Sequence, residues 1–242
     1  ARGGRAAHAG LLGHLLGDFV FQPGRLVVAK RRGTAGVLLH TGIVTACTAL
    51  ALLGNIARLW PAVLLVGLAH LAIEYLSIRA RSLMEATGLA LFLLDQALHI
   101  VSIAVIAVCL GDGRQPIIGL WPTSLALLAV ACGMLASMFL GSILAFEVRV
   151  AALGGDASDL TGPILRMDGS RIFGFFERGL ALGVAVFAPV PLLGALVFLP
   201  RVAYSFTHSG AVRARNMNDA AVGLSICAVA WLFIVLTTSV RF

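Results

Sequence analysis

The chain has 242 residues, of which 60% are hydrophobic and only 12% are charged, and its mean hydropathy is +0.99. Soluble proteins carry about 25% charged residues. So few charges would not cover a water-soluble surface, which excludes a soluble enzyme, a disordered chain and a secreted disulfide scaffold. We therefore predict an all-α, polytopic transmembrane helix bundle, because in lipid the backbone polar groups have to be satisfied within each helix.

The formal net charge is +7 and the isoelectric point is about 10.2. In a soluble protein this balance would suggest nucleic acid. No basic run with interleaved aromatic residues is present, so we expect no nucleic-acid partner. The basic residues are expected in loops, where they set the topology and attract anionic membrane lipids.

Apolar segments that would form membrane helices follow one another along the whole chain. They span residues 6–21, 35–56, 61–78, 87–110, 122–146, 171–188, 190–207 and 217–239. This predicts about eight helices, the first of them short. We expect a single integral membrane domain over residues 1–242, in which a four-helix part (6–110) precedes the remaining helices (122–239).

The loops of such a bundle alternate between the two sides of the membrane. The loops after the first, third, fifth and seventh segments hold eleven Lys and Arg residues, and the termini and other loops hold five. Because cytoplasmic loops are enriched in Lys and Arg, we expect the first set in the cytoplasm and both termini outside.

Three pairs of ionisable residues recur at four-residue spacing within the first four segments. They are His14 with Asp18, His70 with Glu74, and Asp95 with His99; a lone residue, His40, lies in the second segment. Residues four apart share one face of a helix. Each group lies eight to ten residues from the predicted cytoplasmic end of its helix, which places all of them at a common depth of about 12–15 Å.

Ionisable groups within a membrane are costly and usually mark function. Imidazole nitrogens with carboxylate oxygens suit a divalent transition metal (Zn, Mn or Fe), and helix bundles hold one or two such ions in this way. The predicted ligands are His14, Asp18, His40, His70, Glu74, Asp95 and His99. Two alternatives remain open: hydrogen-bonded helix contacts without a metal, and a proton or ion pathway.

A further charged pair, Glu177 and Arg178, lies early in the sixth segment. It would either orient helices as an ion pair or take part in chemistry, with Arg178 on an anion and Glu177 as a base. The loop 147–171, which holds Asp156, Asp159 and Asp168, is long enough for a lid but also fits a solvated linker.

The runs His14–Gln22, Leu38–His40, His70–Glu74 and Phe92–His99 resemble a family of bacterial membrane proteins, domain-of-unknown-function family 3307. The resemblance covers residues 8–110 and continues through Arg171–Arg178. It departs at Glu74, where the family usually has Asp, and at Leu199-Pro200-Arg201, which stands in place of a Lys-Ser segment. The resemblance implies a multi-pass protein of the bacterial inner membrane and names no reaction.

These patterns lead to the hypothesis of a membrane-embedded, metal-dependent enzyme with hydrolase-like chemistry. Asp95 or Glu177 would act as general base, and Arg178 would stabilise developing negative charge. Its substrate would be an amphiphilic lipid or isoprenoid-type molecule near the cytoplasmic leaflet. The alternatives are a transporter or ion-coupling protein, and a non-catalytic or cofactor-binding subunit of a larger membrane complex.

Overall fold

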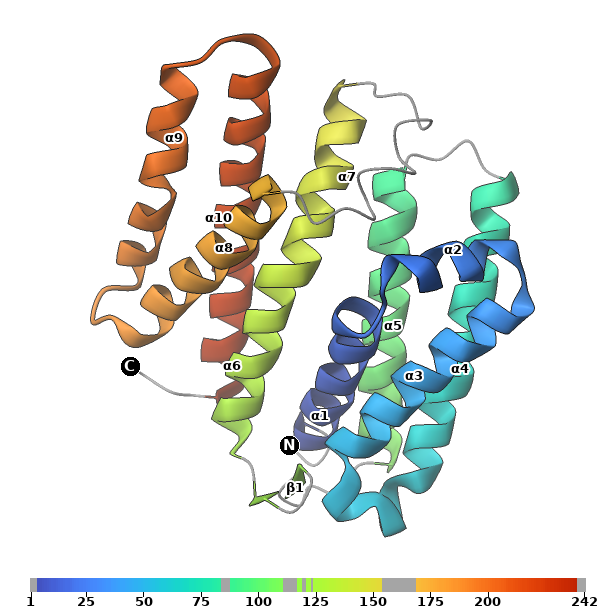
Figure 1. The fold of residues 1–242 in the computed structure, drawn as a ribbon. Coiled ribbons are helices and arrows are strands. Elements are labelled where there is room, and N and C mark those ends of the chain that lie inside the picture. Colours follow the sequence, from blue (N-terminus) through green and yellow to red (C-terminus); the bar gives the residue numbers. More distant parts are fainter. Residues whose placement is uncertain are drawn as a thin grey trace. The chain divides into compact units, whose positions relative to one another are not determined.

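The computed structural model of the chain describes residues 4–83, 88–110, 117–118, 121–122, 124–153 and 169–238. Helices make up nearly all of the described secondary structure (Figure 1). The exception is an antiparallel pair of two-residue strands, β1 (Ile117–Ile118) and β2 (Trp121–Pro122). The predicted all-α class is confirmed.

Five helices in the described part of the chain are long and apolar enough to cross a membrane. They are Thr34–Ala51, Leu53–Arg81, Gly88–Leu110, Leu125–Ala152 and Gly210–Thr238. Their outer faces carry large apolar side chains such as Leu68 and Val108, which are 62% and 72% exposed. Since water would not solvate such faces, the chain is a helical membrane protein.

The predicted segments 6–21, 171–188 and 190–207 are helical but are not among these five candidate spans. The first is short, and the second contains the charges of Glu177 and Arg178. The third is divided into a 3-10 helix, η6 (Pro191–Phe198), and a short helix, α9 (Leu199–Phe206). Pro191 and Pro200 stand at the starts of these two pieces, because proline is favoured in a first helical turn.

The chain divides into two compact units, Ala1–Cys132 and Gly133–Phe242. The division falls inside one continuous helical run made of α6 (Leu125–Leu135), the π-helical turn η3 (Ala136–Leu140) and α7 (Gly141–Leu153). Each unit therefore has its own packing, and the two are treated separately below.

The first unit is built from four main helices. α1 (Gly4–Leu15), which continues into the π-helical turn η1 (Leu16–Val20), packs against both α3 (Thr34–Ala51) and α5 (Gly88–Leu110). α4 (Ile56–Leu83) also packs against α3 and α5, so the four helices enclose one interior. The short basic helix α2 (Gly24–Arg32) packs against α3, and η2 (Leu53–Asn55) leads into α4.

Small residues on α1 set its close approach to α3, as their four-residue spacing predicts. A Cβ atom on Gly13 would lie 2.5 Å from the Cα of Thr48, and one on Gly17 would lie 2.7 Å from the Cα of Val44. Any larger residue would push the two backbones apart. This contact fixes the end of α1 that carries His14 and Asp18.

In the second unit, α10 (Gly210–Thr238) packs against α7, α8 (Gly169–Phe187) and α9, and α8 packs against η3 and η6. The interior positions of α8 include the charged residues Glu177 and Arg178. Residues 154–168, where a lid or linker with Asp156, Asp159 and Asp168 was predicted, lie outside the described residues.

Candidate functional site

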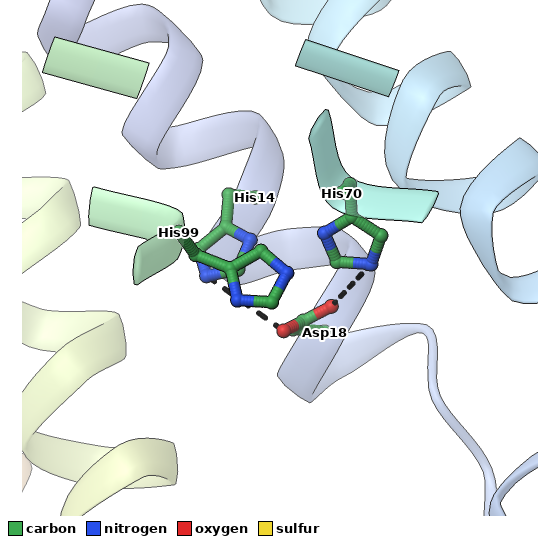
Figure 2. Close-up of side chains that lie close together, drawn as sticks. All are labelled: His14, Asp18, His70 and His99. Atoms are coloured by element: carbon green, nitrogen blue, oxygen red, sulfur yellow. Dashed lines mark ion pairs between the residues drawn. The ribbon is translucent and has the colours of Figure 1, made fainter. Parts of the chain in front are cut away.

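Four histidines from four helices converge in the interior of the first unit. His14 of α1, His40 of α3, His70 of α4 and His99 of α5 are each at most 1% exposed. Neighbouring rings lie close: the centroids of His70 and His99 are 4.4 Å apart, and those of His14 and His99 are 4.8 Å apart and stacked. The predicted convergence at one level is therefore present in the folded unit (Figure 2).

Asp18 lies at the centre of these rings, and its two oxygens face different histidines. Its Oδ1 is 3.0 Å from His40 Nε2 and 3.4 Å from His70 Nε2, and its Oδ2 is 3.7 Å from His14 Nε2. The π-helical turn η1 carries Asp18 at the end of α1. One carboxylate thus connects the histidines of three helices.

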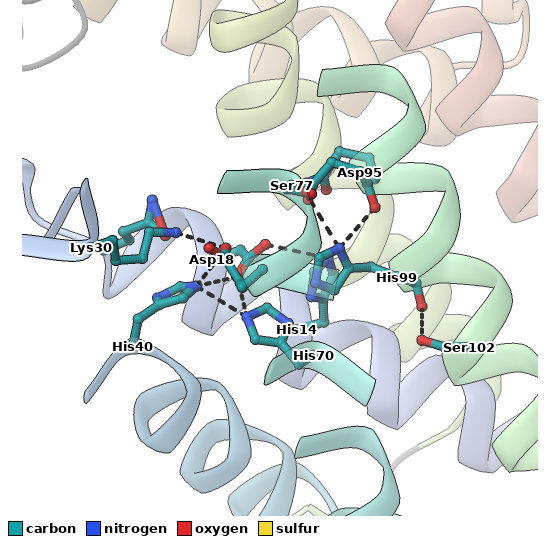
Figure 3. Close-up of polar contacts among 12 residues, drawn as sticks. His14, Asp18, Lys30, His40, His70, Ser77, Asp95, His99 and Ser102 are labelled. Carbon is teal, nitrogen blue, oxygen red and sulfur yellow. Dashed lines mark hydrogen bonds and ion pairs between the residues drawn. The ribbon is translucent and has the colours of Figure 1, made fainter. Parts of the chain in front are cut away.

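Glu74 forms a second acidic position beside His40. Its Oε1 is 3.3 Å from His40 Nε2 and accepts a hydrogen bond from Lys30 Nζ at 2.7 Å. The same Lys30 ammonium donates to Gln22 Oε1 at 3.1 Å. The helix α2 therefore contributes a cation to the edge of the cluster (Figure 3).

The hydrogen bond of His99 defines which of its ring nitrogens has a lone pair available for a metal ion. Its Nδ1 lies 2.8 Å from the backbone oxygen of Asp95, and because a carbonyl only accepts, Nδ1 carries the proton. In the neutral ring the lone pair is then on Nε2, which is buried and has no hydrogen-bond partner among the described residues. Metal-binding histidines are commonly oriented by a hydrogen bond of this kind.

Ligand atoms in this cluster form two overlapping groups whose members all lie within 4.8 Å of one another. One comprises His14, Asp18, His70 and His99, and the other comprises Asp18, His40, His70 and Glu74. Both ring nitrogens of His14 are likewise buried without a hydrogen-bond partner in the described part of the chain. Unsatisfied imidazole nitrogens beside carboxylates are the donor set that a divalent transition metal requires.

Asp95, which was predicted as a ligand, lies outside both groups. Its carboxylate accepts hydrogen bonds from Ser77 Oγ at 2.5 Å and from Gln96 Nε2 at 3.0 Å, and Oδ2 is 3.8 Å from His99 Nδ1. In this position Asp95 orients His99 from the Nδ1 side of its ring, through its backbone oxygen. Its predicted role as a base stays a prediction.

An apolar pocket lies one helical turn from the cluster, inside the same unit. It is small, with a volume of about 10 Å³, and it is partly open. Gly10, Val66 and Ile103 line it, and each stands four residues from a cluster histidine on its own helix. Thr48 is the polar side chain of its lining. This arrangement places a polar centre beside an apolar volume.

The other predicted charged residues, Glu177 and Arg178, belong to the second unit and do not pair with each other there. Glu177 Oε2 accepts a hydrogen bond from Arg201 Nε at 2.7 Å. Arg178 Nε donates to the backbone oxygen of Ser137 at 2.8 Å, and its Nη2 donates to Met138 O and to Ser142 Oγ. Their predicted roles, as base and anion contact, stay predictions.

Two residues at these sites were not predicted as site residues. Lys30 was counted only as a loop charge, although it lies eight residues from Gln22, whose side chain it contacts. Arg201 is 4% exposed and also reaches Asp219, at 3.4 Å. The available signal was that Arg201 is a charged residue inside the predicted apolar segment 190–207.

Comparisons with known proteins were made for the whole chain. No curated protein and no solved structure matches it. The model of a family described as "Protein of unknown function (DUF3307)" matches residues 8–117. All the histidines and carboxylates of the cluster fall within this match, so the chain is similar to the DUF3307 family in the four-helix part that carries the cluster.

Proposed function

We propose that the first unit is the metal centre of a membrane-embedded enzyme, with hydrolase-like chemistry on a lipid or isoprenoid-type substrate. The observation that carries the proposal is the convergence of four buried histidines and two carboxylates from four helices within ligand distance. Burying so many ionisable groups in a membrane protein is costly unless they serve a function. We place the protein in the bacterial inner membrane, with the cluster toward the cytoplasmic leaflet.

The overlap of the two ligand groups supports a site for one or two ions. Asp18 belongs to both groups, and its two oxygens approach different histidines, His14 of one group and His40 of the other. A carboxylate can bridge two metals, which in two-metal sites lie about 3.5–4 Å apart. His70 also belongs to both groups, but a neutral imidazole has only one lone pair and would serve one ion.

A divalent metal in this site would acidify water and polarise an oxygen of the substrate. The chain's own residues supply the surroundings. Asp95 holds the Nδ1 proton of His99 in place, and Lys30 offers a positive charge at the edge of the cluster. The lining of the small pocket at Gly10 and Ile103 places apolar side chains beside the cluster, which supports an amphiphilic substrate.

Two alternative functions, an ion pathway and a haem-binding subunit, fit the structure less well. An ion pathway needs polar groups on both sides of the cluster, whereas the adjoining pocket is lined by apolar residues apart from Thr48. A haem-binding subunit needs room for a macrocycle between its axial ligands. The stacked rings of His14 and His99, 4.8 Å apart, argue against that space.

Metal analysis of the purified full-length chain tests the proposal. We expect one or two transition-metal ions per chain in wild type, and loss of metal in His14→Ala and His99→Ala. His208→Ala is the matched control, because His208 lies in the second unit and contacts Tyr204. A wild-type protein that stays metal-free after incubation with Zn²⁺, Mn²⁺ and Fe²⁺ would overturn the metal centre.

The enzyme class needs a separate experiment. Metal-loaded wild type is incubated with a bacterial lipid extract, and the products are identified by mass spectrometry. We expect new cleavage products that are absent with chelator-stripped wild type and with His99→Ala. Metal binding without any lipid turnover would contradict the enzyme and leave the binding or transport alternatives.

A further inference from the structure

Arg178 of the second unit is a buried cation whose hydrogen bonds all go to neutral groups, while the carboxylates of Asp219 and Glu177 attract it without a direct contact. It is 2% exposed, and its contacts go to two backbone oxygens and one hydroxyl. It forms no ion pair with any described residue. The π-helical turn η3 supplies the two carbonyls. These contacts engage Nε and Nη2, so the third nitrogen of the guanidinium, Nη1, keeps its hydrogens for another acceptor.

A second guanidinium presents an unused nitrogen at the same place. Arg201 engages Glu177 through Nε, and Asn216 and Asp219 through Nη1. Its Nη2 is buried and has no partner among the described residues. A Cβ atom placed on Gly174 would lie 3.1 Å from Arg178 Nη1 and 3.4 Å from Arg201 Nη2. The absent side chain of Gly174 thus lets two unpartnered nitrogens lie close to its backbone, where even a methyl group would be a tight fit.

Gly174 and Arg178 also line a small, partly open pocket in the second unit. Its other lining residues are Ser142, Ala145, Phe146, Arg149, Arg215 and Asp219. Asp219 is already paired with Arg149 at 3.5 Å and with Arg201 at 3.4 Å. The pocket therefore combines three guanidinium groups with one carboxylate that is ion-paired.

We propose that Arg178 and Arg201 form a binding site for a phosphate group, entered through the pocket at Gly174. Guanidinium groups bind phosphate oxygens by directed, charge-assisted hydrogen bonds. Each of the two buried guanidiniums has one nitrogen without an acceptor among the described residues, and a bound anion would supply that acceptor. The phosphate is either that of a lipid headgroup or a free phosphate ion. The site belongs to the second unit and does not depend on metal in the first.

Calorimetric titration of the delipidated full chain in detergent tests this site with three probes. They are dihexanoyl phosphatidylglycerol, inorganic phosphate, and dihexanoylglycerol, which lacks the phosphate. We expect binding of a phosphate-bearing probe and none of dihexanoylglycerol. Binding of the phospholipid alone identifies a lipid headgroup, and binding of inorganic phosphate as well identifies the free ion. Failure of both phosphate-bearing probes overturns the proposal.

Gly174→Ala is the decisive variant, because its added methyl group would press on the two unpartnered nitrogens while both arginines are kept. We expect it to weaken binding at least about tenfold, as for the loss of one charge-assisted hydrogen bond. Gly183→Ala on the same helix is the control, since its Cβ atom would meet nothing within 4 Å. Wild-type affinity in Gly174→Ala overturns the site.

A second variant covers the case in which Gly174→Ala fails to fold, as judged by its melting temperature. Arg178→Lys keeps the positive charge but has a single ammonium, which lacks the fork that reaches both η3 and the pocket. We expect it to lose phosphate binding as well. Wild-type affinity in Arg178→Lys would show that Arg178 acts only as a helix contact.

Discussion

Asp18 has contacts that no other residue of the cluster shares. It approaches His14 of its own helix, His40 of α3 and His70 of α4, and it belongs to both groups of candidate ligands. Glu74 belongs to one group only. At the scale of single residues, neutralising Asp18 should therefore remove more bound metal than neutralising Glu74.

Asp18→Asn should remove all bound metal, and Glu74→Gln should remove at most half of it. Both changes keep the side-chain shape and remove a negative charge, so the difference reflects the shared position of Asp18. The measurement is metal content per chain by mass spectrometry. Asp95→Asn is the control, because Asp95 lies outside both groups, and it should keep the wild-type metal content. Wild-type metal content in Asp18→Asn would contradict the shared-ligand assignment.

Lys30 should oppose metal binding rather than support it. Its ammonium is 2.7 Å from Glu74 Oε1, where it competes with a metal cation for the same carboxylate. Like charges about 4 Å apart repel by roughly 1 kcal/mol or more. Lys30→Met should therefore lower the Kd for Zn²⁺ by about fivefold to tenfold, measured by competition with a chromophoric chelator.

Arg25→Met is the control for this effect, because Arg25 is an exposed residue of the same helix α2. Its replacement should leave the Kd unchanged. Weaker Zn²⁺ binding in Lys30→Met would instead mean that Lys30 holds the cluster in shape.

Secondary-structure elements show where sequence patterns stop being informative. The four-residue spacing of His and acidic residues predicted which helix faces meet, and those faces do meet. The π-helical turns η1 and η3 were not predictable, because no residue pattern marks them, yet one carries Asp18 and the other supplies the carbonyls for Arg178. π turns often occur at functional sites within helices.

The start of one helix, α4, was predicted wrongly at a proline. The third segment was expected to begin at Pro61, but α4 begins at Ile56 and contains Pro61 in its second turn. Membrane helices tolerate an internal proline when neighbouring groups satisfy the freed carbonyl. A sequence read alone does not show those neighbours.

The close contact between α1 and α3 gives a prediction at the scale of elements. Gly13→Ala should lower the free energy of unfolding by about 1–3 kcal/mol, because the added methyl meets the backbone of Thr48 and has no side chain to displace. It should also weaken metal binding, since α1 carries both His14 and Asp18. Denaturant titration in detergent micelles measures the first effect.

Gly42→Ala on α3 is the matched control, since a Cβ atom there meets nothing within 4 Å. Alanine is a better helix former than glycine, so this variant should be as stable as wild type or slightly more stable. Equal stability of Gly13→Ala and Gly42→Ala would contradict the packing argument.

At the scale of the whole molecule, composition was enough to predict the helical membrane class. Loop charges and residue spacing were enough to bring His14, His40, His70 and His99 to one level. The cross-helix contacts, such as His40 with Glu74 and Lys30 with Glu74, were not predictable, because they depend on helix rotation and on α2, which was expected to be a loop. The division of the chain into two units after Cys132 was also not predictable, because it falls inside an unbroken apolar segment.

The orientation of the chain in the membrane rests on loop charge and can be tested at two exposed glycines. Gly33, between α2 and α3, should face the cytoplasm, and Gly54, between α3 and α4, should face the opposite side. The exposed Cys109 is first replaced by serine, because the other three cysteines are buried. In intact bacterial spheroplasts, a membrane-impermeant maleimide should label Gly54→Cys, and should label Gly33→Cys only after permeabilisation. The reverse labelling pattern would place the basic loops outside the cytoplasm. Lys30 and the edge of the cluster that it contacts would then lie on the outer side, and the proposed substrate would come from the outer leaflet.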